Sequence, residues 1–203
     1  MKIHDLSPGG FAANTYLVTK GKGAVLIDCA APAADVLAAL EKEGVKLLAI
    51  LLTHGHFDHM LTVADVKAKT GAPVYLARAD ADLPADGEKN AFSLFFGENH
   101  SYPDADLLFD DGDTLSFGEL TFKVIATPGH TRGSSCFFCK EALFTGDTLF
   151  AAGYGRCDLF GGDAKALVAS LERLSVLSYD LLIYPGHDRA EALGTALQNL
   201  SFI

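Results

Sequence analysis

The chain contains 203 residues, of which 49% are hydrophobic, and 26 acidic against 16 basic residues give it a formal net charge of −10. A chain of this length can bury about 70% of its unfolded surface, which predicts a single domain over residues 1–203. The acidic balance, without any basic stripe, argues against a nucleic-acid partner. No run of about 18 apolar residues and no apolar leader are visible, so we expect a cytoplasmic protein without a membrane partner.

Short apolar runs and turn residues predict strands and helices that alternate along the chain. The predicted strands cover residues 15–18, 24–27, 47–52 and 74–76 in the first half and 122–126, 136–138, 142–144 and 181–184 in the second. The predicted helices are Ala33–Glu43 followed by Gly44, a helix after His59 that ends near Gly71, and Ala164–Ser175 capped by Asp163. Two sheets with helices outside them would bury both apolar faces. Periodicity alone therefore predicts one α/β domain.

Four potential metal ligands, His54, His56, Asp58 and His59, lie within six consecutive positions. At the end of an extended strand, His54 and His56 point to the same face, and Asp58 continues this alternation. If the chain turns into a helix after Phe57, Asp58 and His59 lie in its first turn and reach a neighbouring point. The segment therefore predicts a metal site, and it could serve two metal ions.

Three further candidate ligands each follow an apolar run that is predicted to be a strand. They are His130 in Thr-Pro-Gly-His-Thr, Asp147 in Thr-Gly-Asp-Thr and His187 in Tyr-Pro-Gly-His-Asp. Each directly follows a glycine, which suits a loop with a positive φ or a close backbone approach. Only His4 and His100 lie outside these motifs. Any one histidine alone could be an ordinary buried residue, but together they indicate a metal centre.

The motifs and their order resemble those of the metallo-β-lactamase superfamily and, within it, of single-domain hydrolases similar to glyoxalase II. The resemblance runs from the Asn-Thr-Tyr-Leu-Val segment at residues 14–18 to the Pro-Gly-His loop. It implies a four-layer αββα sandwich with metals at one edge between the sheets. It also implies a set of ligands: His54, His56 and His130 for a first metal, Asp58, His59 and His187 for a second, and Asp147 bridging both. Asp28 matches an aspartate of the family that hydrogen-bonds a metal ligand and orients it.

The ligand set predicts the chemistry of the site. Two divalent cations would leave the site positive, because Asp58 and Asp147 neutralise only half of their charge. Two ions about 3.5–4 Å apart can share one water and lower its pKa to about 7. The expected reaction is attack of a metal-bridging hydroxide on an acyl carbon, and a thioester such as hydroxyacylglutathione suits it because a thiolate leaves readily. Imidazole and carboxylate ligands suit zinc, which we expect, and also iron or manganese.

Residues 79–106 are expected to help shape the substrate pocket. This segment is poor in predicted strands and carries Phe92, Phe95 and Phe96. It either forms a lid over the site or holds a surface helix whose aromatic side chains pack inward. His100, in the same segment, is not expected to bind metal.

Arg156 lies in a second segment that is expected to shape the pocket. In relatives similar to glyoxalase II, a basic residue at this position helps to hold the substrate, so the resemblance implies that Arg156 binds substrate. Alternatively, Arg156 pairs with Asp158 or Asp163 and shapes the loop, as arginine side chains often do.

The four cysteines are not expected to form a metal site or a disulfide. Cys136 and Cys139 lie three positions apart in a predicted strand, so their side chains point to opposite faces. With Cys29 and Cys157, they are predicted to be reduced thiols that pack as small hydrophobic groups.

Several functions remain open at this point. Glyoxalase II itself has a C-terminal helical domain that contributes glutathione contacts, whereas this chain ends soon after His187, so the acyl and thiol parts of the substrate are undetermined. The strongest alternative is an iron-dependent persulfide dioxygenase, which residues 54–59 and 155–158 also resemble. A lactonase is a further alternative, and a β-lactamase or a metal-binding protein without turnover is less favoured. We expect a small-molecule substrate, and the sequence does not address the oligomeric state.

Overall fold

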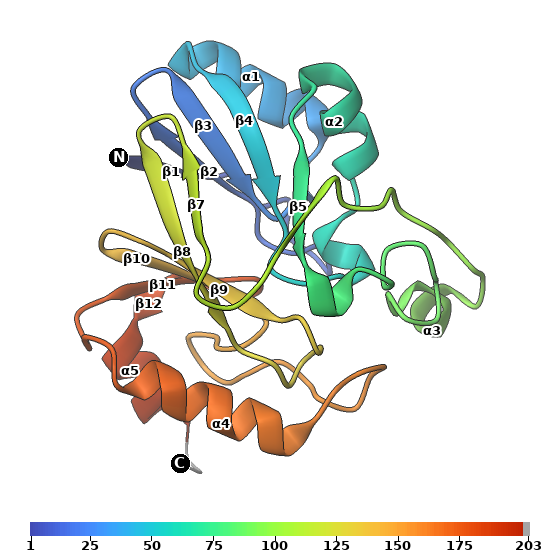
Figure 1. Cartoon of the computed structure of the whole chain (residues 1–203), viewed down its shortest axis with the longest axis vertical. Coiled ribbons are helices and arrows are strands. Elements are labelled where there is room, and N and C mark those ends of the chain that lie inside the picture. The colour runs from blue at the N-terminus through green and yellow to red at the C-terminus, as the bar shows by residue number, and fades with distance from the viewer. Residues whose placement is uncertain (201–203) are drawn as a thin grey trace.

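Two six-stranded β-sheets face each other in the computed structural model, which describes residues 1–200 (Figure 1). The sequence predicts one domain over residues 1–203, of which residues 201–203 lie outside the described range. The first sheet has the order β1 (Lys2–Asp5), β2 (Tyr16–Lys20), β3 (Gly23–Ile27), β4 (Lys46–Leu51), β5 (Val74–Ala77) and β6 (Leu107–Phe109). The second has the order β12 (Glu191–Ala192), β11 (Leu182–Pro185), β10 (Ala142–Gly146), β9 (Ser135–Cys139), β8 (Leu120–Ala126) and β7 (Thr114–Phe117). Strand β4 is parallel to β3 and β5, and β10 is parallel to β11.

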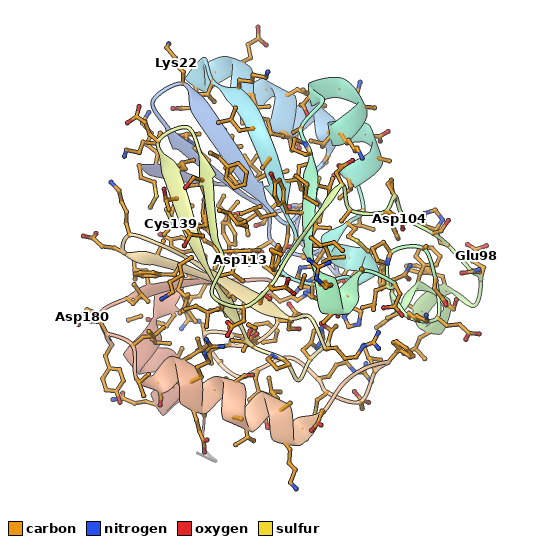
Figure 2. All side chains as sticks on the ribbon, in the orientation of Figure 1. Lys22, Glu98, Asp104, Asp113, Cys139 and Asp180 are labelled. Atoms are coloured by element: carbon orange, nitrogen blue, oxygen red, sulfur yellow. The ribbon has the colours of Figure 1, made fainter. Side chains whose placement is uncertain are left out.

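Three apolar clusters fill the spaces between four layers. The central cluster joins the facing sides of the two sheets. A second cluster packs the first sheet against α1 (Ala33–Glu43) and α2 (Val63–Thr70), and a third packs the second sheet against α4 (Ala164–Ser175) and α5 (Leu193–Gln198). The two helix pairs lie on opposite outer faces in Figure 1, and Figure 2 shows side chains filling the space between the sheets, with Lys22 and Asp180 at the periphery. The predicted four-layer αββα sandwich is therefore confirmed.

The helices begin and end where local chemistry requires. At the start of α4, Asp163 Oδ1 accepts hydrogen bonds from the backbone N–H groups of Lys165 and Ala166 at 2.8 and 3.1 Å. These bonds satisfy N–H groups that the first helical turn leaves without partners. At the end of α1, Gly44 takes a left-handed conformation with φ of 63°, which glycine adopts without steric cost. Among the helices of residues 1–200, none is long and apolar enough to cross a membrane.

All predicted strands and helices are present, with ends that shift by a few residues. The structure adds β1, β6, β7, β12, α5 and the short helix α3 (Phe92–Phe96). The added strands are edge or near-edge elements with weak burial patterns; β6, for example, buries only Phe109. After His56 the chain forms a 3₁₀ turn over Phe57–His59, and the helix predicted after His59 is α2, which begins at Val63 and ends before Gly71.

The cysteines occupy the positions that strand alternation predicts. In β9, Cys136 packs in the cluster beneath α4 and α5, whereas Cys139 packs in the central cluster between the sheets. All four cysteines are free. Burial raises the pKa of Cys29 to about 12 and that of Cys136 to about 11, so both remain protonated thiols.

Candidate metal centre

Three histidine nitrogens from the two sheets converge at one point. His54 and His56 lie in the loop that follows β4, and His130 lies in the loop that follows β8. The distances are 3.1 Å from His54 Nε2 to His56 Nδ1, 2.9 Å from His56 Nδ1 to His130 Nε2, and 3.2 Å from His130 Nε2 to His54 Nε2. Burial lowers the pKa of His54 well below its usual range and that of His56 to about 3, which keeps these two imidazoles neutral. A neutral imidazole is the form that binds a metal ion.

A second group of potential ligands lies beside the first. Asp58 and His59 come from the 3₁₀ turn after β4, and His187 comes from the loop after β11. Asp58 Oδ2 lies 3.1 Å from His187 Nε2 and 3.9 Å from His59 Nε2. The turn therefore brings Asp58 and His59 together with His187, as a first helical turn was expected to do, while His59 also stays close to His54 of the first group.

Asp147, at the end of β10, lies between the two groups. Its Oδ1 is 3.2 Å from His59 Nε2, and its Oδ2 is 3.5 Å from His130 Nε2 and 3.7 Å from His187 Nε2. Burial acts to raise the pKa of Asp147, but the surrounding imidazoles, with His59 first, lower it below its usual range. The carboxylate is therefore an anion within reach of both groups.

Buried polar atoms without partners test whether the site would fit a metal ion. Among the described residues, three buried side-chain atoms have no hydrogen-bond partner: His56 Nε2, His59 Nε2 and Asp147 Oδ1. Buried polar atoms without partners are rare and need an explanation such as an ion. Burial acts to lower the pKa of His59, yet the carboxylates of Asp28, Asp147 and Asp58 raise it well above its usual range. The surroundings of the His59 ring therefore favour positive charge. The candidate ligand atoms form three overlapping sets, and within each set they lie within 4.8 Å of one another: His54, His56 and His130; His54, His59 and Asp147; and Asp58, His59 and His187. Imidazole nitrogens and carboxylate oxygens placed in this way fit divalent metal ions.

Asp28 orients the ring of His59 through its Nδ1 atom. Its Oδ2 lies 2.8 Å from His59 Nδ1, and its Oδ1 accepts a 2.8 Å hydrogen bond from the backbone N–H of Thr53. Asp28 also adopts a positive φ of 54°, an uncommon conformation outside glycine. The contact fixes the His59 ring with Nε2 free to face Asp147, the geometry expected of a residue that orients a metal ligand.

The loop that carries His187 is held by the Asn-Thr-Tyr segment near the N-terminus. Asn14 Nδ2 donates to the backbone carbonyls of Pro185 and Asp188, and the Tyr16 hydroxyl donates to that of Pro185. Gly186 is packed so closely that a Cβ there would lie 2.6 Å from His59 Cε1. The glycine before His187 is therefore required by close approach.

Asp80 is a buried residue of the site that the sequence analysis did not identify. Its Oδ2 accepts hydrogen bonds from the backbone N–H of Gly55 at 3.1 Å and from Thr131 Oγ1 at 2.7 Å, and its Oδ1 accepts one from the N–H of Gly133 at 2.7 Å. One carboxylate thus ties the loop of His54 and His56, in one sheet, to the loop of His130, in the other. The available signal was its position just after β5, beside the strand whose end carries the first histidines.

A cavity of about 520 Å³ opens over the candidate ligands. Its lining combines metal-ligand candidates with apolar side chains: Phe11, His56, Phe57, Asp58, Ala91, Phe95, Phe96, His130, Asp147, Phe150, Gly155, Arg156, Leu159 and His187. Helix α3 supplies part of this wall, while Phe92 packs inward against Phe57. Residues 79–106 therefore combine a pocket wall with inward packing. The His100 ring packs against the rings of Phe92 and Tyr102.

Arg156 lines the cavity, but its guanidinium is engaged in an ion pair. Arg156 Nε and Nη2 donate to the two carboxylate oxygens of Asp158, each at 2.7 Å. Asp163 instead caps α4. Of the two expected pairings, the one with Asp158 is present, and the contact of Arg156 with substrate stays a prediction.

The fold and the clustered ligands define a metallo-hydrolase architecture, and the comparisons with known proteins agree. The family model of the Metallo-beta-lactamase superfamily matches residues 8–187, and the chain belongs to this superfamily. It is 32% identical over 190 residues to the probable metallo-hydrolase YqgX of Bacillus subtilis (strain 168), covering 92% of this chain and 90% of that protein. It is 42% identical over 165 residues to the hydroxyacylglutathione hydrolase of Fuscovulum blasticum, covering 80% of this chain but 56% of that hydrolase.

Solved structures of the same fold resemble the chain over nearly its whole length. The BLEG-1 B3 metallo-β-lactamase superposes with a TM-score of 0.91 at 32% identity, covering 97% of each chain. TTHA1623 in a di-iron-bound form superposes with a TM-score of 0.86 at 35% identity, covering 98% of this chain and 100% of that one.

Proposed function

We propose that the protein is a metal-dependent hydrolase with a dinuclear site and that it cleaves a small-molecule thioester. The observation that carries the proposal is the position of Asp147. Its two carboxylate oxygens lie 3.2 Å from His59 and 3.5 Å from His130, which belong to the two separate ligand groups. One carboxylate that serves two clusters suits a pair of metal ions better than a single ion.

In this proposal one ion would be held by His54, His56 and His130 and the other by Asp58, His59 and His187, and Asp147 would lie within reach of both. The donor set of imidazoles and carboxylates without a thiolate suits zinc, and iron or manganese would also fit. When bound, such ions supply Lewis acidity toward a carbonyl oxygen and lower the pKa of water.

The side chains of the site have separable roles. Asp58 is the less buried of the two aspartates, with 17% of its side chain exposed, and it lines the cavity, so it can orient the attacking water. Asp147 and Asp28 hold the histidines in place. Arg156 would contact a polar group of the substrate through Nη1, because Nε and Nη2 bind Asp158. No serine or cysteine nucleophile is needed.

The proposed substrate class draws on the similarity to a hydroxyacylglutathione hydrolase, whose name specifies a thioester substrate. The leaving thiolate needs little assistance from a general acid. We also propose that the protein acts in the cytoplasm, where free thiols such as its four cysteines persist.

The proposal is tested by a hydrolysis assay on zinc-loaded protein with a panel of thioesters, lactones and, because of the similarity to BLEG-1, a β-lactam. The variant Asp58→Ala should lower kcat for the best thioester by about 10²–10³-fold while the thermal transition is retained. Asp104→Ala, at an exposed carboxylate outside the cavity, is the matched control and should keep the wild-type rate. Hydrolysis that is unchanged in Asp58→Ala, or a panel without any cleaved thioester, would contradict the proposal.

A second candidate is an iron-dependent persulfide dioxygenase. The observation that favours it is the di-iron form in which the similar protein TTHA1623 was crystallised. Metal analysis of the protein as purified, combined with oxygen uptake in the presence of glutathione persulfide, separates the two functions. Oxygen consumption without thioester cleavage would favour the dioxygenase.

A further inference from the structure

A group of contacting phenylalanine rings adjoins the candidate ligands in the same cavity. The ring of Phe57 lies 6.1 Å from that of Phe11, 5.5 Å from that of Phe95 and 5.6 Å from that of Phe96, measured between centroids. These four residues, here named the aromatic wall, all line the cavity. Two of them belong to α3, which projects at one side of the molecule in Figure 1.

Three of the four rings of the aromatic wall are exposed to a degree that is unusual for large apolar side chains, whereas Phe57 is buried. Phe11 is 61% exposed, Phe95 56% and Phe96 49%. Single exposed apolar residues are ordinary, but a contiguous apolar patch marks a binding surface. Because these rings contact one another, the patch is contiguous. A ligand that covers it removes apolar surface from water and gains affinity.

Helix α3 is fixed in place by a buried asparagine. Asn90 Nδ2 donates to the carbonyl oxygens of Pro84 and His100 at 3.1 and 3.0 Å, and Asn90 Oδ1 accepts from the N–H of Phe92 at 2.9 Å. The backbone N–H of Phe57 donates to the Asn90 carbonyl at 3.0 Å. The wall is therefore formed before any ligand arrives, which reduces the entropy lost on binding.

The charges around the cavity disfavour a substrate with several carboxylates. Among the described residues that line it, Arg156 is the only lysine or arginine, and its guanidinium already binds Asp158 through two nitrogens. A thiol such as glutathione, which carries two carboxylates, would find no unpaired basic side chain in this lining.

We infer that the substrate carries an uncharged apolar group, of the size of a phenyl ring or a short alkyl chain, which packs on the aromatic wall while the reacting carbonyl lies at the ligand groups. Phe150, whose ring lies 6.0 Å from that of His187, also lines the cavity. The cavity volume is within the range of small-molecule sites. The inference rests on the proposed thioester hydrolysis and narrows its substrate.

The kinetic test uses two matched series of thioesters on zinc-loaded protein. In the first, acetyl, butyryl and 4-phenylbutyryl groups are joined to N-acetylcysteamine; in the second, the acetyl group is joined to ethanethiol, 2-phenylethanethiol or glutathione. At least one series should show a rise of about tenfold or more in kcat/KM for the phenyl member. The glutathione thioester should be the poorest member of its series.

The variants Phe95→Ala and Phe11→Ala, from two different segments, should remove most of that preference by raising KM for the phenyl member. Leu94→Ala is the matched control, since Leu94 lies on the same helix and is 64% exposed but does not line the cavity. It should leave the preference unchanged. Because all three side chains are exposed, the variants are expected to fold.

A binding measurement separates failure of the inference from failure of the proposed function. By calorimetry on the zinc-loaded protein, 4-phenylbutyrate should bind about tenfold or more tightly than butyrate, and Phe95→Ala should abolish the difference. If this holds but no thioester is cleaved, the apolar site stands and the proposed reaction fails. If thioesters are cleaved but both carboxylates bind equally, the inference fails alone. A concentration-dependent dimer that dissociates in Phe95→Ala, with equal carboxylate affinities, would show that the wall is an interface between copies and would overturn the inference.

Discussion

The candidate metal ligands and the aromatic wall adjoin the same cavity but are built in opposite ways. The ligands are here named the rim and are His54, His56, Asp58, His59, His130, Asp147 and His187. The ligands lie on short loops at the ends of β4, β8, β10 and β11, and these loops donate buried hydrogen bonds to Asp28 and Asp80. Two of the four wall residues, Phe95 and Phe96, lie on the five-residue helix α3 and are exposed. If the proposed function holds, the loops at the sheet ends would position the metal ligands, whereas a separate and more exposed segment would contact the substrate. Changes at the rim should therefore abolish metal binding and turnover, and changes in the wall should alter selectivity.

The largest expected effect is at the residue shared by both ligand groups. Asp147→Ala should lower the zinc content from two ions per chain to one or fewer and reduce thioester hydrolysis by about 10²–10³-fold. The metal content is measured by inductively coupled plasma mass spectrometry on dialysed protein. Asp104→Ala should retain two ions. Equal metal content in the two variants would show that Asp147 is not needed to bind the metal ions.

Asp80 tests whether buried support, and not only the ligands, defines the rim. Asp80→Asn places an amide N–H₂ where the carboxylate accepts three hydrogen bonds, so we expect metal affinity to fall by about 10–100-fold and the free energy of unfolding by about 1–3 kcal/mol. Zinc titration against a chromophoric chelator and urea unfolding measure the two quantities.

The neighbouring Asp82 offers a matched control. Its carboxylate pairs with Lys89 and Arg132 at the surface, where ion pairs contribute less than about 1 kcal/mol. Asp82→Asn should keep wild-type metal affinity. An equal loss in both variants would indicate a general effect of removing charge.

Removing the N-cap of α4 should have a smaller effect, which lowers stability but leaves metal binding unchanged. Asp163→Ala removes the N-cap of α4 and should lower the free energy of unfolding by about 1 kcal/mol without changing metal content. Urea unfolding of the metal-free protein measures the loss, with Lys165→Ala as the control in the same turn. A loss of metal content in Asp163→Ala would show that α4 supports the rim, which the comparison does not predict.

The smallest expected effect concerns Arg156. If it contacts substrate through Nη1, Arg156→Ala should raise KM a few-fold with kcat unchanged, the signature of lost uniform binding. Asp158→Ala frees the guanidinium and should lower KM or leave it unchanged. A rise in KM of equal size in both variants would favour a purely structural ion pair.

The sequence predicted the rim far better than the wall, for physical reasons that particular residues show. His54 and His56 lie in the loop after the apolar strand β4, and His130 lies in the loop after β8. Their spacing and their places near strand ends indicated a metal centre, and the family resemblance implied which of them share an ion. The 3₁₀ turn at Phe57–His59 was less predictable, because a helical pattern begins only with α2. Asp80 escaped notice because a single aspartate after a strand is ordinary, and its three partners come from loops distant in sequence. The aromatic residues of α3 were noticed, but only the fold shows that they contact Phe11 and Phe57 and face the ligands.

The central claim is that seven side chains hold two metal ions on either side of Asp147. It is tested most directly by anomalous X-ray scattering from crystals of the full chain grown with zinc. The account predicts two peaks, one at His54, His56 and His130 and one at Asp58, His59 and His187, about 3.5–4 Å apart. A single peak, or peaks away from these side chains at saturating zinc, would contradict it.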